Sequence, residues 1–151
     1  MRHATITVNN RIRNGNSLGK QMAQFKIDWG VHVPHLGRDT NRETLINFVR
    51  QLENLGVHSG WVSDHVCWPK DIASAYPYTD DGSFAPSTDM SWLDPIGTLL
   101  FLAGCTTKLR LGTSVLILPY RQPVVTAKQL ATLDVLSNGR LILGAGIGWM
   151  A

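Results

Sequence analysis

The sequence predicts an α/β protein built on a parallel sheet, and three observations lead to this expectation. From residue 26 onward, short β-rich runs alternate with helical patterns in the order β-α-β-α-β-α-β, which right-handed crossovers turn into a parallel sheet flanked by helices. Polar residues and glycines gather at the carboxyl ends of the expected strands, and no glycine-rich phosphate turn follows the first strand. These last two observations favour the first half of a (β/α)8 barrel, with its first four βα units, over a doubly wound sheet.

The first strand and helix are marked by local signals. A β-rich run at residues 27–33 ends at Pro34 and Gly37, so a strand is expected there. Thr40 and Glu43 then have the spacing of a capping box, and apolar residues follow at helical spacing up to Gly56. The sequence therefore predicts a helix with Thr40 as its N-cap and an end at Gly56.

Three more strands and two more helices follow. Strands are expected at residues 60–66, 109–118 and 140–147, and the second of these is almost continuously apolar, as is typical of strands covered on both faces. Asp94 and Pro95 have the residue types preferred at the N-cap and first position of a helix. The last helix is expected after Pro123, with its end at Leu136.

The connection at residues 67–92 is much longer than most loops between a strand and a helix. It is rich in aromatic residues, namely Tyr76, Tyr78, Phe84 and Trp92. Because it leaves a strand at its carboxyl end, we expect it to overhang the barrel mouth and to help form a substrate pocket.

Composition indicates one globular domain and excludes several classes of protein. The chain has 151 residues, of which 44% are hydrophobic and 17% charged, enough for a buried core. The longest apolar stretch, around residues 99–103, is far too short to cross a bilayer, so no membrane partner is expected. Cys67 and Cys105 have no CxxC spacing and no neighbouring histidine cluster. No disulfide framework or metal site is therefore predicted, and a reducing cytoplasm is the expected location.

The net charge of +3 comes from the N-terminal segment. Four basic residues precede the first acidic one, Asp28, and they are Arg2, Arg11, Arg13 and Lys20. Without them the net charge is negative, so a nucleic-acid partner is not expected. Residues 1–25 also lack an apolar signal region and a helical stripe. We expect a disordered basic extension there, explained by a transit peptide or by a true start at Met22, and one domain at residues 26–151.

The carboxyl ends of the expected strands bring a polar cluster together. For His32 and His35 a structural role is the simpler interpretation. His65 follows Asp64 at the end of a buried strand, where adjacent side chains point to opposite faces, so the two are not expected to form a catalytic triad. A histidine at this position is suited to donating a hydrogen bond to a bound ring or to stabilising charge on it.

Three further features leave alternatives open. Residues 144–148 read GxGxG and not the dinucleotide fingerprint GxGxxG, so they either let a flat ligand approach the backbone or pack tightly against a neighbouring strand. Residues 112–114 either let a flat ligand approach the backbone in the same way or mark a bulge. Arg121 either binds a ligand or lies exposed on the surface. Among the tryptophans, Trp92 and Trp149 are the ones placed to touch a ligand.

Several motifs are specific in combination. They are GWVSDH at residues 60–65, YPYTDDG at 76–82, LDP at 93–95, LRLGTSV at 109–115, LPYRQP at 118–123, KQLATLD at 128–134, SNGRL at 137–141 and GIGW at 146–149. With them, residues 26–151 resemble the luciferase-like monooxygenase superfamily, in its branch of coenzyme F420-dependent oxidoreductases.

This resemblance implies a TIM barrel of the bacterial-luciferase type that binds a reduced flavin or 5-deazaflavin at its mouth. The implied activity is hydride transfer to or from a small organic substrate with coenzyme F420, or monooxygenation with FMN as the alternative cofactor. His65 falls on the active-site histidine, and Ser114–Val115 on a non-proline cis peptide. The implied cofactor contacts are Asp64, Ser114, Val115, Ile117, Ile147 and Gly148. A homodimer of the full-length protein is also implied.

The sequence departs from the family in two respects. Trp149 stands where the sugar-phosphate dehydrogenases of the superfamily have a glutamate proton donor, which argues against a sugar-phosphate substrate. Family members are roughly twice as long, as a complete barrel requires, and their later strands hold the phosphate arm of the cofactor. We therefore expect this chain to bind cofactor weakly or not at all by itself. The alternative to an enzyme is a truncated, non-catalytic chain that serves in folding or subunit association.

Overall fold

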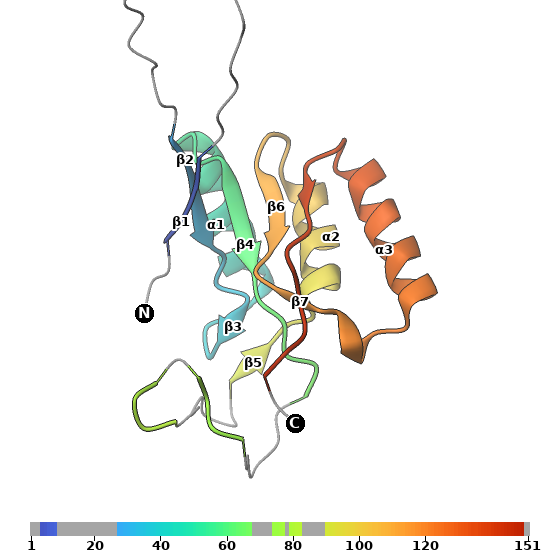
Figure 1. Ribbon diagram of the computed structural model, residues 1–151. Coiled ribbons are helices and arrows are strands. Elements are labelled where there is room, and N and C mark those ends of the chain that lie inside the picture. Colours follow the sequence, from blue (N-terminus) through green and yellow to red (C-terminus); the bar gives the residue numbers. More distant parts are fainter. Residues whose placement is uncertain (1–3, 9–26, 68–73, 78, 83–89, 150–151) are drawn as a thin grey trace, which may run out of the picture.

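A computed structural model describes residues 4–8, 27–67, 74–77, 79–82 and 90–149. Its centre is a five-stranded sheet in the order β1-β2-β4-β6-β8 (Figure 1). The strands are β1 (Ala4–Val8), β2 (Ile27–His32), β4 (Ser59–Val62), β6 (Arg110–Thr113) and β8 (Leu141–Ile142). β2, β4, β6 and β8 are parallel to one another, which confirms the predicted α/β fold with a parallel sheet.

The three helices are α1 (Arg42–Asn54), α2 (Pro95–Cys105) and α3 (Pro123–Leu136). α2 begins as predicted, because the Asp94 side chain accepts a hydrogen bond from the Gly97 amide at 2.8 Å. The predicted N-cap of α1 is wrong by one residue. Asn41 Oδ1 accepts the Thr44 amide at 2.9 Å, whereas the Thr40 hydroxyl donates to the Pro34 carbonyl. An asparagine competes well for this position because its short side chain reaches the same amides.

The third and fourth predicted strands are each interrupted. After β6 the Ser114–Val115 peptide is cis, as the resemblance implies, and the chain resumes as β7 (Leu116–Ile117) and the 3-10 turn Leu118–Tyr120. Beyond β8 it resumes as β9 (Ala145–Gly146), which pairs in parallel with β7. The continuous strands predicted at residues 109–118 and 140–147 are therefore wrong, because each is split into two short segments that pair in different sheets.

The N-terminal segment differs from the expectation of disorder at one place. Residues 4–8 form β1, which pairs antiparallel with β2 along its outer edge. The sequence there is ATITV, and its four consecutive β-branched residues favour a strand when an open sheet edge supplies the partner. Residues 9–25 of the expected extension lie outside the described residues.

The long connection between β4 and α2 returns to the sheet at its carboxyl end. β5 (Ser91–Trp92) pairs antiparallel with β3 (Leu36–Gly37), which follows β2. Both short strands lie beyond the ends toward which the arrows of β2, β4 and β6 point (Figure 1). Of the aromatic residues of this connection, Tyr78 and Phe84 lie outside the described residues. No helix in the described part is long and apolar enough to cross a membrane.

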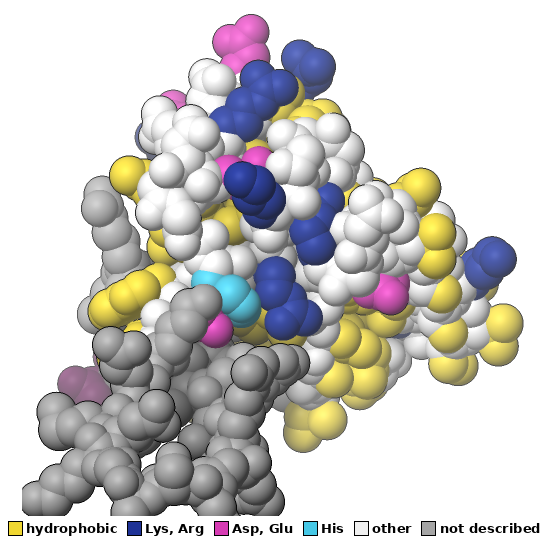
Figure 2. Space-filling view, turned by 90° about the horizontal axis from the view of Figure 1, so that it is seen from above, with side chains coloured by type: hydrophobic (Ala, Val, Ile, Leu, Met, Phe, Trp, Pro, Cys, Tyr) yellow, Lys and Arg dark blue, Asp and Glu magenta, His cyan; other side chains and the backbone are white. Residues whose placement is uncertain are grey.

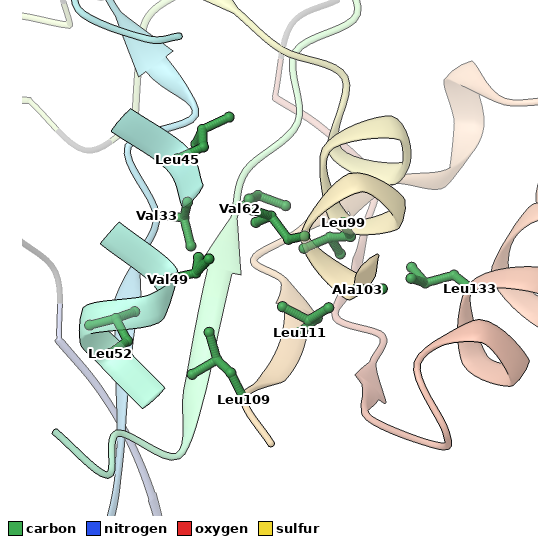
Figure 3. Close-up of a cluster of buried hydrophobic side chains, with 11 residues drawn as sticks. Val33, Leu45, Val49, Leu52, Val62, Leu99, Ala103, Leu109, Leu111 and Leu133 are labelled. Carbon is green, nitrogen blue, oxygen red and sulfur yellow. The ribbon is translucent and has the colours of Figure 1, made fainter. Parts of the chain in front are cut away.

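A hydrophobic core joins the helices to one face of the sheet (Figure 3). Val33, Val62, Leu109 and Leu111 come from the strands or their ends and are at most 1% exposed. They pack with side chains of the three helices, namely Leu45, Val49, Leu52, Leu99, Leu102, Ala103 and Leu133. Burying this many aliphatic side chains is the main stabilising contribution, and it fixes the strand ends that carry the polar residues.

The opposite face of the sheet is built around Trp61. A Cβ atom at Gly30 of β2 or at Gly112 of β6 would collide with the indole ring of Trp61, so the ring lies across both neighbouring strands. Its Nε1 donates to the Ser59 hydroxyl at 2.9 Å. Gly112 is thus required for close packing of a protein side chain, which is a structural reason for a glycine in this strand.

Candidate functional site

The candidate site lies at the carboxyl ends of the parallel strands, where (β/α) barrels carry their active sites. His35 follows β2, Asp64 and His65 follow β4, Arg121 follows β7, and Trp149 follows β9. Residues that the sequence analysis placed on four separate strand ends therefore meet at one end of the sheet.

His65 lies among aromatic rings. Its ring centroid is 4.6 Å from that of Trp92 and 6.4 Å from that of Trp149, and Trp149 in turn contacts Tyr76 at 5.0 Å. Burial lowers the pKa of His65, and the nearby negative charge of Asp64 opposes this shift only in part. A half-buried imidazole that stays neutral near pH 7 can both donate and accept a hydrogen bond.

His35 is a structural residue, as the simpler interpretation of the sequence held. It is 0% exposed. Nε2 lies 3.1 Å from the Ser63 amide nitrogen and 3.0 Å from the Ser63 carbonyl oxygen, and Nδ1 lies 3.0 Å from the Val33 carbonyl oxygen. Burial lowers the pKa of His35 against the raising effect of its backbone hydrogen bonds. The neutral ring therefore ties the end of β2 to the end of β4.

Asp64 is enclosed, and both of its carboxylate oxygens accept hydrogen bonds. Oδ1 lies 2.9 Å from Arg121 Nη2, while Oδ2 accepts from Arg121 Nε at 3.2 Å and from the Ile117 amide at 2.9 Å. Arg121 Nη2 also donates to Asp94 Oδ2 at 3.0 Å. Burial lowers the pKa of Arg121, but the two carboxylates outweigh it and raise the pKa overall. Arg121 is therefore a buried link between two acids and not an exposed surface residue.

The glycines of residues 144–148 pack against the interrupted third strand. A Cβ atom at Gly144 would collide with the Thr113 carbonyl oxygen, and one at Gly146 with the Val115 side chain. Gly148, with a φ of +83°, would bring a Cβ to 3.1 Å from Ile117 Cγ2. Of the two alternatives left open by the sequence, tight packing against a neighbouring strand therefore accounts for Gly144 and Gly146.

An open groove of about 430 Å³ lies beside these glycines. It is lined by Leu118, Pro119, Arg121, Pro123, Ala145, Gly146 and Ile147. Ile147 is 84% exposed and Val115 43% exposed, so two of the residues expected to contact a cofactor present apolar surface here. Ile117 is 4% exposed, and its amide is already bonded to Asp64. Within the described ranges, no cluster of three or more His, Cys, Asp or Glu side chains could hold a metal ion.

Two parts of this site were missed by sequence reasoning. Asp94 was recognised as a helix cap, but its second oxygen binds Arg121, and no local pattern reveals that pairing. The link between His35 and Ser63 joins residues 28 positions apart. Both contacts form because β2, β4 and β6 lie side by side and parallel. The predicted parallel order of these strands was the sequence signal that could have indicated them.

Comparison with known proteins gives a consistent family. Residues 24–151 match the sequence profile of the luciferase-like monooxygenase family. The F420-dependent glucose-6-phosphate dehydrogenase of Amycolatopsis mediterranei is 35% identical over 105 residues, which make up 69% of this chain and 27% of that protein.

Two solved structures share the fold. The coenzyme F420-dependent tetrahydromethanopterin reductase of Methanopyrus kandleri has a TM-score of 0.52 and 26% identity, over 79% of this chain and 26% of that one. The oxygenating constituent of 3,6-diketocamphane monooxygenase of Pseudomonas putida, in complex with FMN, has a TM-score of 0.56 and 19% identity, over 79% and 29%. The chain thus has the architecture of part of a luciferase-like TIM barrel, and it spans about a third or less of the length of these proteins.

Proposed function

Since the chain belongs to the luciferase-like monooxygenase family, we propose that it forms part of an oxidoreductase that uses coenzyme F420, in preference to FMN, for hydride transfer. The observation that carries the proposal is the placement of the half-buried His65 at the same end of the sheet as the cis Ser114–Val115 bulge. The F420-dependent relatives, at 35% and 26% identity, support F420 over FMN. The FMN-containing structure, at 19% identity, supports the fold alone.

The residues at the mouth fit a flat, largely apolar ring system. The apolar side chains of Val115 and Ile147 are exposed beside a groove with few polar groups in its wall. Ligand sites of this kind combine apolar surface with a small number of polar groups that fix orientation. Ser114, Val115, Ile147 and Gly148 would hold the ring, with Asp64 and Ile117 forming the wall behind them.

A reduced deazaflavin held there would supply a hydride for transfer to the substrate. The protein contributes a neutral imidazole at His65, which can donate a hydrogen bond toward developing negative charge or exchange a proton with the substrate. The rings of Trp92 and Trp149 beside His65 shield it from water and strengthen such a hydrogen bond. Trp149 carries no carboxylate, so this site offers no acidic proton donor at that position and does not suit a sugar phosphate.

Titration of the 151-residue chain with oxidised F420 and with FMN, followed by the visible absorbance of each cofactor, tests the proposal. We expect a weak, saturable spectral change that reaches half-saturation at a lower concentration of F420 than of FMN. Ile147→Asp should abolish this change, because it places a charge on the apolar surface that faces the ring.

The matched control is Val135→Asp, a substitution of another highly exposed aliphatic residue, at 74%, on α3. It should leave the titration unchanged. The proposal fails if FMN reaches half-saturation at a lower concentration than F420, or if Val135→Asp and Ile147→Asp weaken binding equally.

A further inference from the structure

Asp64 stands next to His65, yet its side chain is turned into the protein and is 0% exposed. We propose that Asp64 is a positioning residue that, together with Arg121, holds the segment after the Ser114–Val115 bulge against the end of β4, and that it does not contact a ligand itself. This inference rests on the proposed function in one respect: the segment it positions is the one assigned to the cofactor ring.

The bonding of Asp64 leaves no free face for a ligand. Three donors, Arg121 Nε, Arg121 Nη2 and the Ile117 amide, lie within 3.2 Å of its two oxygens. The Arg121 side chain that covers it is itself only 13% exposed. A buried carboxylate is tolerated when its charge is paired and its lone pairs accept hydrogen bonds, and this one meets both conditions from within the protein.

The clasp, by which we mean Asp64, Arg121 and Asp94, joins two successive βα units, that of β4 and α2 and that of β6 and α3. Asp64 follows β4, and Asp94 caps α2. Arg121 closes the turn after β7, where its backbone amide donates a hydrogen bond to the Leu118 carbonyl at 3.0 Å. The two oxygens of Asp94 have different partners. Oδ1 accepts the Gly97 amide at the start of α2, and Oδ2 accepts a hydrogen bond from Arg121. Displacing Arg121 therefore removes two of the three donors that hold the Asp64 carboxylate in place against the Ile117 amide, two residues after the cis peptide.

The clasp also sets the charge that His65 experiences. Among the described residues, His65 faces the uncharged rings of Trp92 and Trp149 and lies near the carboxylate of Asp64, and Arg121 compensates that carboxylate. Removing Arg121 exposes the negative charge to His65, whereas removing the charge of Asp64 takes it away. The two substitutions should therefore shift the titration of His65 in opposite directions, which a general loss of packing would not do.

The experiment uses the 151-residue chain without any ligand and compares Arg121→Gln, Asp64→Asn and the milder Arg121→Lys with wild type. NMR follows the His65 ring through a pH titration and the exchange of the Ile117 amide with solvent. Arg50→Gln on the exposed side of α1 is the matched control. We expect the His65 midpoint to rise in Arg121→Gln and fall in Asp64→Asn, and Ile117 exchange to accelerate about tenfold in both, as for one lost hydrogen bond. Arg121→Lys keeps the charge, so it should accelerate Ile117 exchange with a smaller shift of His65.

The inference is overturned if Ile117 exchange is unchanged in both Arg121→Gln and Asp64→Asn, or if both move the His65 midpoint in the same direction. It is also overturned if Asp64→Asn abolishes the F420 titration while Ile117 exchange stays at the wild-type rate, because Asp64 would then be a direct contact. If the expected NMR changes occur but wild type binds FMN in preference to F420, the positioning role of Asp64 is confirmed and the proposed function fails.

Discussion

The two ends of the sheet each carry a polar network centred on an arginine, but the partners of the two arginines differ. At the carboxyl end, Arg121 donates to the carboxylates of Asp64 and Asp94. At the amino end, Arg140 donates to backbone carbonyls of four residues and to one hydroxyl. The carbonyls belong to Ala103, Thr106, Leu109 and Ser137, and the hydroxyl to Thr106.

The difference in partners distinguishes an arginine network that only stabilises the fold from one that also acts on the candidate site. Figure 2, which looks onto the amino end of the sheet, shows basic and acidic side chains interspersed there, with hydrophobic side chains along the flank where α3 lies. Backbone carbonyls carry no charge and cannot titrate, so the Arg140 network fixes loops and responds little to its surroundings. The carboxylates of Asp64 and Asp94 set the electrostatic field beside His65, so the Arg121 network can tune chemistry.

The largest effect is expected from Arg140→Ala. It leaves carbonyls of the α2 and β6 connections without their donor, and unpaired buried acceptors are costly. We expect a loss of about 2–4 kcal/mol in the free energy of unfolding, measured by urea denaturation. Arg140→Lys should recover part of it. A larger loss of stability in Arg121→Ala than in Arg140→Ala would contradict the conclusion that the Arg140 network is the structural one.

Gly144→Ala probes the packing that shapes the carboxyl end. Its Cβ would collide with the Thr113 carbonyl oxygen, which is backbone and cannot rotate away, so we expect a loss of about 1–3 kcal/mol. Gly104→Ala in α2 is the control, because no atom lies within 4 Å of its added Cβ, and it should stabilise the helix by about 0.5–1 kcal/mol. Equal unfolding midpoints for the two variants would show that the close approach at Gly144 does not exist.

The parts of the fold that were predictable from sequence are those with local causes. α2 and α3 begin at Pro95 and Pro123 as expected, because proline and the capping side chain before it act within one turn. The strand after Leu109 was predicted as continuous, because apolar periodicity does not register a cis peptide. β1 was overlooked because its short β-branched run is surrounded by asparagine, arginine and glycine, which dominate any longer window.

The sequence predicts where the candidate site lies, but it does not predict which side chains bond to one another there. Parallel strand order places Asp64, His65 and Arg121 at one end of the sheet, and that much follows from the alternation of strands and helices. The pairing of Asp64 with Arg121 spans 57 positions, and whether Arg121 is exposed or buried depends on where the turn after β7 lies. Side-chain partners of this kind are fixed by tertiary packing, which no local pattern encodes.

Glu53→Gln tests the second contact at the amino end. Glu53 Oε1 accepts the amides of Thr107, Lys108 and Leu109. Burial raises its pKa, but these hydrogen bonds outweigh burial and lower the pKa overall. We expect a loss of about 1–2 kcal/mol at neutral pH, with Glu43→Gln in the first turn of α1 as a nearly neutral control.

The pH dependence of this loss has a defined sign. Because the pKa of Glu53 is lower in the folded chain, its stabilisation is fully present above the ordinary glutamate pKa of about 4.3 and disappears as pH falls through the folded value. The urea midpoints of wild type and Glu53→Gln should therefore converge in acid. A gap that persists unchanged to the lowest accessible pH would mean that the charge of Glu53 plays no part.

The smallest effect is expected for His35. As pH falls, the titration of His35 should destabilise the carboxyl end of the sheet before the amino end. Burial lowers the pKa of His35 in the folded chain, so the unfolded chain binds its proton more readily and stability declines below the ordinary histidine pKa of about 6.5. A ring that stays neutral when folded costs at most about 0.7 kcal/mol between pH 7 and pH 6. His35→Gln should be less stable than wild type at pH 7 but should lose less on acidification over this interval. If the two proteins lose the same free energy of unfolding between these pH values, His35 is not the group that titrates, and the two ends respond to acid together.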